Sequence, residues 1–130
     1  MEKARLIFLC VGKSIVVEDE DLIDVVTAVS GSGPAYFFLV MEEMIKAGVD
    51  MGLPQDLATA MVLQTAKGAA LMAEQADREG QSPSDLWKKV ATKGGTTEAA
   101  FQVFTEGRLG PVIGAGMKQA CSRSRELSNG

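Results

Sequence analysis

Residues 30–38 read SGSGPAYFF, and this stretch decides between two folds. Two glycines one residue apart, ahead of an apolar run, are typical of a loop that holds the phosphates of a dinucleotide. The full fingerprint needs a third glycine and a preceding strand, but Tyr36 occupies the third position and the preceding residues have a helical period. The alternative is that Gly31 and Gly33 allow another backbone to come close while Pro34 begins a helix. We favour this second interpretation, in which the stretch packs helices together.

Helical periodicity extends over most of the chain. Apolar residues recur at helical spacing in DLIDVVTAV (21–29), PAYFFLVMEEMIKAG (34–48), PQDLATAMVLQTAKGAALMAEQAD (54–77) and the segment after Pro111. SPSD (82–85) has the pattern of a capping box with proline at the first helical position. Gly48 is expected to end the helix that covers residues 34–48. The sequence therefore predicts an all-α fold.

The first residues do not follow this pattern. KSIVVE (13–18) predicts one short strand, and no second strand is evident with which it could form a ladder. We therefore expect residues 1–18 to be the end of another folding unit and residues 19–130 to form the helical domain.

Composition excludes several classes of function. The chain of 130 residues has a net charge of −4, whereas nucleic-acid binders usually present a basic face. It contains no histidine, so Ser-His and Cys-His catalytic systems and the commonest zinc ligand are absent, and we expect no metal site. Cys10 and Cys121 form no metal-type pair, and both are expected to be small buried residues. No stretch is expected to cross a membrane and no signal peptide is evident, so we expect a cytoplasmic protein.

The predicted helices are too apolar for a monomer. AMVLQTAKGAALMA (60–73) has small or apolar residues on more than one side. Because a helix that is apolar most of the way round is usually buried most of the way round, we expect a partner chain.

A second glycine-containing stretch, TKGGTT (92–97), precedes a predicted helix that begins near Thr97. The free amides of a helix N-terminus beside two hydroxyl groups can hold a small anion such as a carboxylate. An ordinary helix cap, with Thr97 as the N-cap residue, explains the same residues equally well. The pattern alone leaves both interpretations open.

Taken in order, DLIDVVTAVSGSGPAYFF, AGVDMGLP, QTAKGAA, ATKGGTTEAA and ACSRSRELS resemble the C-terminal domain of pyrroline-5-carboxylate reductase over nearly the whole chain. The resemblance implies an all-helical, interlocked homodimer, or dimers assembled into a decamer. It implies NADPH- or NADH-dependent reduction of 1-pyrroline-5-carboxylate to L-proline, with the cofactor held mainly by a separate N-terminal domain. Residues 1–18 then correspond to the end of that domain, and the chain alone is expected to dimerise but to be inactive.

The resemblance also implies site residues. The substrate carboxylate is expected on the loop that includes Gly94, Gly95, Thr96 and Thr97, with Thr92 as a further hydroxyl donor; Lys93 stands where the family often has proline. Thr27 matches a threonine that lies near the ring nitrogen, where its hydroxyl would act in catalysis. A threonine that bonds back to its own helix is the plain alternative.

The resemblance implies no complete cofactor site in this chain. It places Ser30 and Gly31 beside the nicotinamide. Two other functions stay open: a non-catalytic helical dimerisation or binding module, and a reductase of another small imine or oxo acid.

Overall fold

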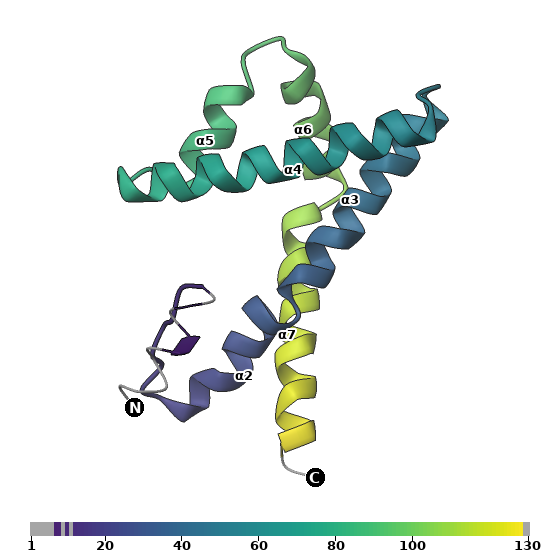
Figure 1. Ribbon diagram of the computed structural model, residues 1–130. Helices are drawn as coiled ribbons and strands as arrows, with labels where there is room; N and C mark the ends of the chain where they lie inside the picture. Colours follow the sequence, from purple (N-terminus) through teal and green to yellow (C-terminus); the bar gives the residue numbers. More distant parts are fainter. Residues whose placement is uncertain (1–6, 9, 11, 129–130) are drawn as a thin grey trace.

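The helices form where apolar residues recur at helical spacing, and the computed structural model describes residues 7, 8, 10 and 12–128. A short 3-10 turn, η1 (Glu20–Leu22), leads into α2 (Ile23–Val26), the π turn η2 (Thr27–Gly31) and α3 (Gly33–Asp50). The helices α4 (Gln55–Arg78), α5 (Pro83–Val90), α6 (Thr96–Glu106) and α7 (Leu109–Ser128) follow. Figure 1 shows an open arrangement in which α4 crosses the end of α3 and α7 lies beside the junction of α2 and α3. The predicted all-α fold is confirmed for this part of the chain.

The SGSGP stretch lies inside a helical path and forms no loop. The Ser32 amide donates to the Thr27 carbonyl at 2.8 Å, which closes the wide π turn, and the Ala35 amide donates to the Ser32 carbonyl. These backbone amides are therefore used within helical turns and do not form a phosphate loop. Within one chain a side chain at Gly31 would only touch the Thr27 methyl group at 3.5 Å, and one at Gly33 would meet nothing. The predicted close approach of another backbone to these glycines therefore does not occur between elements of this chain.

This continuous path corrects the expectation about membranes. Glu20–Asp50 is, by length and composition alone, a helical stretch apolar enough to cross a membrane, and only 11% of its most apolar 18 residues are buried. The sequence pattern had suggested a break at Gly31 and Gly33, but the π turn carries the helix past them. An unpartnered apolar helix of a protein that assembles with another chain has the same property.

The contact between α3 and α4 explains a glycine that was predicted to end a helix. Gly48 lies inside α3 and is buried, and a side chain there would touch Leu53 at 3.4 Å and Ala58 at 3.5 Å. The helix runs on to Asp50, and Gly52 follows it with a φ of +104°, which favours glycine. Gly48 therefore allows the two helices to approach, and the prediction that it ends the helix is wrong.

The capping box predicted at residues 82–85 is present. The Asp85 amide donates to the Ser82 hydroxyl oxygen, and the Asp85 carboxylate accepts hydrogen bonds from the Ser82 hydroxyl and amide. The bond from the Ser82 hydroxyl is the main reason why the pKa of Asp85 lies below its ordinary value of 3.8. The start of α5 is thereby fixed on the solvent-exposed side of the molecule.

The predicted strand at residues 13–18 is absent. Residues 13–19 have no regular structure, because the described part of the chain supplies no second strand to pair with them. An ion pair of 3.3 Å between Lys13 and Glu74 holds this segment to α4 and is the largest cause of the lowered pKa of Glu74. Cys10 is exposed and Cys121 half-buried, so neither cysteine is buried within one chain as the sequence had predicted.

Very little of the apolar surface is covered. Among the described residues only three apolar side chains are buried: Ala28, Ala58 and Ala76. The chain exposes 10639 Å², whereas a compact monomer of 13.7 kDa exposes about 6,600 Å². The excess of about 4,000 Å² is larger than the roughly 1,000–2,500 Å² that each protomer buries in an obligate interface of about 2,000–5,000 Å² in total. The surface of one chain is therefore that of an incomplete fold.

Candidate functional site

Two segments of the chain carry the candidate site residues: the π turn η2 and the 92–97 loop between α5 and α6. The turn η2 packs against α2, α3 and α7, whereas the loop lies beyond α4 at the opposite end of the molecule (Figure 1). Thr27 and the loop are therefore not brought together within one chain.

The loop is held from both sides. The ring centroids of Trp87 on α5 and Phe101 on α6 lie 5.0 Å apart, and Phe104 meets Phe101 edge-on at 6.1 Å. Lys88 lies 5.6 Å from the centre of the Trp87 ring. Of these contacts the Trp87–Phe101 pair joins α5 to α6 across the 92–97 loop, and an aromatic pair contributes about 1 kcal/mol.

The glycines of this loop shape its backbone. Gly94 has a φ of +74°, which other residues adopt only with strain. A side chain at Gly95 would lie 2.8 Å from the Thr92 hydroxyl oxygen and 2.9 Å from the Thr92 carbonyl oxygen, so only glycine fits. Thr92 thus packs against Gly95 within the loop, and the side chain of Lys93 is exposed.

The amides of the two glycines already have partners. The Gly94 amide donates to the Glu98 carboxylate at 2.7 Å, and the Gly95 amide donates to the Thr92 carbonyl at 2.9 Å. Both amides are therefore occupied within this structure while the glycines set the path of the loop, and their role in binding an anion stays a prediction. Sequence reasoning did not single out Glu98, which takes one of those amides.

The start of α6 differs from the simple cap that the sequence allowed. The helix begins at Thr96 with Gly95 as the N-cap residue, and no side chain caps it. Thr97 is therefore not the N-cap residue. Because the first amides of a helix have no partner within the helix, the amides of Thr96 and Thr97 are the ones available to an anion.

The other candidate residues lie on the π turn, and both hydroxyl groups there bond back to the helix. Thr27 donates to the Ile23 carbonyl at 2.9 Å, and Ser30 donates to the Val26 carbonyl at 3.1 Å. Both residues are exposed, as is Gly31. Thr27 therefore makes the hydrogen bond to its own helix that the sequence analysis gave as the alternative. Its hydroxyl oxygen keeps lone pairs that can accept a hydrogen bond from another donor.

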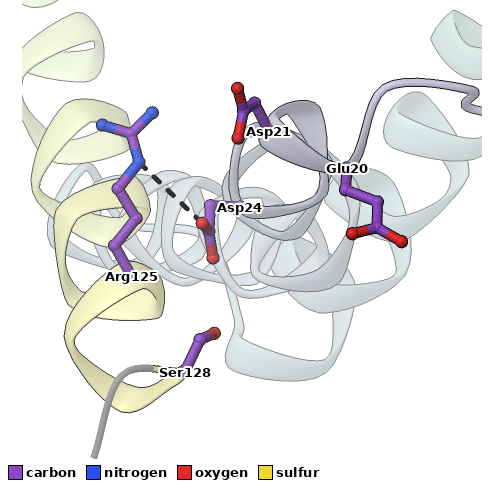
Figure 2. A pocket seen from close by; sticks show the side chains of 5 residues that line it. All are labelled: Glu20, Asp21, Asp24, Arg125 and Ser128. Carbon is purple, nitrogen blue, oxygen red and sulfur yellow. Dashed lines mark ion pairs between the residues drawn. The ribbon is translucent and has the colours of Figure 1, made fainter.

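A polar pocket between α2 and α7 was not predicted. It is lined by Glu20, Asp21, Asp24, Arg125 and Ser128, and Figure 2 shows Arg125 extending toward Asp24. The Asp24 carboxylate accepts a hydrogen bond of 2.6 Å from the Ser124 hydroxyl and lies 3.8 Å from Nε of Arg125. Within the described residues no cluster of His, Cys, Asp or Glu side chains has the arrangement of a metal site.

The described helices leave most of their large apolar side chains exposed, which is typical of a chain that assembles with another. The sequence model described as "Pyrroline-5-carboxylate reductase dimerisation" matches residues 20–127, and the chain belongs to this family.

Relatives and solved structures carry the same family name. The pyrroline-5-carboxylate reductase of Pseudomonas aeruginosa is 42% identical over 98% of this chain, and that of Arabidopsis thaliana is 41% identical over 95%. The solved structure of a pyrroline-5-carboxylate reductase from Coxiella burnetii has a TM-score of 0.90 and 39% identity over 97% of this chain. That of Plasmodium falciparum pyrroline carboxylate reductase, solved with NADP bound, has a TM-score of 0.87 and 30% identity over the same share.

The match covers only part of each relative. The chain spans 45% of the Pseudomonas aeruginosa protein, 43% of the Arabidopsis thaliana protein, and 46% and 47% of the Coxiella burnetii and Plasmodium falciparum structures. It therefore corresponds to about half the length of these relatives.

Proposed function

We propose that this chain supplies the substrate-binding and dimer-forming part of an NAD(P)H-dependent reduction of 1-pyrroline-5-carboxylate to L-proline. The observation that carries the proposal is the match of residues 20–127 to the dimerisation family, together with relatives of that name. The described residues contain no strand and no open phosphate loop, so they do not fit a complete dinucleotide site. The cofactor, NADPH or NADH, would be bound mainly by residues outside this chain, and the chain alone would be inactive.

A homodimer is the assembly we propose. Its support is the excess exposed surface of about 4,000 Å² together with the family description. The separation of Thr27 from the 92–97 loop within one chain points the same way (Figure 1). We place each site between two chains, with the loop of one protomer facing the π turn of its partner.

The loop would hold the substrate carboxylate. The amides of Thr96 and Thr97 lie at the positive end of the helix dipole, and the threonine hydroxyl groups can add further hydrogen bonds. The exposed Lys93 adds a positive charge beside them. The carboxylate of Glu98, which accepts the Gly94 amide at the same end of α6, would repel a bound anion, and the charge of Lys93 would offset this repulsion.

Thr27 would act on the ring nitrogen. Its hydroxyl proton is directed to the Ile23 carbonyl, so its oxygen is oriented to accept a hydrogen bond. A protonated imine carries an N–H donor, and its positive charge makes the adjacent carbon a better hydride acceptor. Thr27 would therefore stabilise the protonated imine as an acceptor, and the nicotinamide, bound beside Ser30 and Gly31, would supply the hydride.

The test is to join this chain to the remaining N-terminal part of the Pseudomonas aeruginosa relative and to follow NADPH oxidation with 1-pyrroline-5-carboxylate. We expect turnover in the fusion and none in the chain alone. Thr27→Val, which keeps the shape and removes the hydroxyl, should lower kcat/KM by roughly 10- to 100-fold, as expected for a hydrogen bond to a charged group. Thr59→Val is the matched control, because Thr59 makes the same bond to its own helix in α4.

The outcome also separates the alternatives. A folded fusion that binds NADPH but reduces no imine would indicate a non-catalytic dimerisation module. Turnover with another small imine or oxo acid, and none with 1-pyrroline-5-carboxylate, would indicate a reductase of that other substrate. A cytoplasmic location, and assembly of dimers into a decamer, stay predictions.

A further inference from the structure

The π turn η2 is an unusual element with an unusual hydrogen bond. A π turn inserts one extra residue into a helix, which disturbs the regular pairing of carbonyls and amides, and such turns are frequent at functional sites. Here the hydroxyl of Tyr36, eight residues along the chain, donates to the carbonyl of Ala28 at 3.2 Å. Ala28 is 2% exposed, so this carbonyl lies where water does not easily replace a lost partner.

The other end of the turn is held by α7. Asp24, one helical turn before Thr27, accepts the 2.6 Å hydrogen bond from Ser124 and faces Arg125 (Figure 2). The side chain of Asp24 is only 18% exposed, whereas that of Arg125 is 59% exposed. The bond to Ser124 joins residues that are 100 positions apart, and α7 packs against both α2 and η2.

We propose that Tyr36 and Asp24 are positioning residues that hold the π turn and thereby fix the orientation of the Thr27 hydroxyl. The inference rests on the proposed role of Thr27. If the turn relaxed to a regular α-helix, the register before it would shift by one residue relative to α3, which corresponds to a rotation of about 100°. Thr27 would then present a different face to the substrate. The two side chains prevent this shift by holding the turn from α3 and from α7.

The experiment is nuclear magnetic resonance on the 130-residue chain in its native assembly, with Tyr36→Phe and Ser124→Ala as the two variants. Tyr36→Phe removes one hydroxyl and keeps the ring. Ser124→Ala removes the hydrogen bond to Asp24 and leaves the ion pair of Asp24 with Arg125 in place. Ser122→Ala is the matched control, because Ser122 is an exposed serine on the same helix. Two signals are measured: hydrogen exchange at the Ser32 amide, which closes the π turn, and the three-bond couplings that report the χ1 angle of Thr27.

In the unmodified chain and in Ser122→Ala we expect one Thr27 rotamer and a protected Ser32 amide. In Tyr36→Phe and Ser124→Ala we expect Ser32 exchange to be faster by about tenfold or more, as for loss of a partner to a buried carbonyl. The Thr27 couplings should become averaged, while exchange in α4 stays unchanged. A general loss of stability would speed exchange in α4 as well and would leave the Thr27 rotamer alone.

Unchanged Thr27 couplings in both variants would overturn the proposal, whether or not Ser32 exchange changes. If a variant fails to fold, the other variant and Asp24→Asn, which keeps an oxygen acceptor for Ser124, decide the question by the same two signals. Neither signal depends on catalysis. An inactive enzyme with the expected Thr27 response would refute the proposed function alone.

Discussion

Replacing Phe37 with serine should separate the two chains of the proposed dimer. Phe37 lies in α3 with 69% of its surface exposed, and the next three residues along the helix are also large, apolar and exposed. Four consecutive residues point in all directions around a helix, so α3 needs apolar partners on most of its sides. Serine and phenylalanine have similar helix propensities, and the substitution therefore tests burial and not helix formation.

The expected magnitude follows from the exposed area. An aromatic side chain can bury about 150–250 Å², so Phe37 offers roughly 100–170 Å² to a partner, worth about 3 kcal/mol per chain. A twofold dimer loses this twice, about 6 kcal/mol, which weakens association by roughly four powers of ten. Glu43→Ser is the control on the same helix, since it removes only an exposed ion pair with Lys46.

The assay is sedimentation velocity combined with circular dichroism over a series of protein concentrations. We expect the unmodified chain to have twice the monomer mass of 13.7 kDa and a helix content that falls only when the dimer dissociates. Phe37→Ser should dissociate and lose helix at far higher concentrations than Glu43→Ser. A stable, fully helical monomer of the unmodified chain would refute the reasoning, because it would show that three buried alanines suffice for the fold.

Three further outcomes are expected. Gly94 and Gly80 both have a φ of +74° with open space around them, so Gly94→Ala and Gly80→Ala should each lower the unfolding free energy by about 1 kcal/mol. Only Gly94→Ala should also weaken the binding of L-proline, measured by calorimetry. Gly95→Ala, whose new carbon would overlap the Thr92 oxygens, should abolish that binding and leave helix content intact. The folded-state pKa of Asp85 is lowered, so its contribution is complete above about pH 3.8 and lost as the pH falls through the lower value. Asp85→Asn should therefore show a smaller decrease of melting temperature between pH 5 and pH 3, and an unchanged decrease would contradict this.

Local chemistry explains which parts of the fold the sequence could predict. The capping box at residues 82–85 depends on side chains three positions apart, and the apolar spacing of the helices is equally local. The strand predicted at residues 13–18 failed because a strand needs a partner that a local pattern does not supply. Gly48 was predicted to end a helix because glycine is common at helix ends, whereas its close contact with Ala58 on the next helix leaves no mark in the local sequence.

The loop at residues 92–97 could be predicted from the sequence but its hydrogen bonds could not, and its role as a binding site stays a prediction. The spacing of the glycines and threonines at 92–97 marked the loop, yet the bond from Gly94 to Glu98 depends on where the helix begins. The apolar spacing of residues 21–29 did not distinguish the π turn at Thr27 from a regular helix, so neither the Tyr36–Ala28 hydrogen bond nor the Asp24–Ser124 hydrogen bond could be expected. The Asp24–Ser124 contact joins residues 100 positions apart, which a local sequence pattern does not reveal.

The separation of the two halves of the site gives the strongest argument that assembly and function are coupled. The described residues show no direct packing between η2, which holds Thr27, and the helices α5 and α6 on either side of the 92–97 loop, although η2 and α6 both contact α7 (Figure 1). If a second chain covers α3, it also determines which loop faces the π turn. Phe37→Ser should then remove L-proline binding together with the dimer, although Phe37 touches no proposed substrate atom. Retained binding in a dissociated chain would show that the carboxylate needs only the loop, and that Thr27 acts elsewhere.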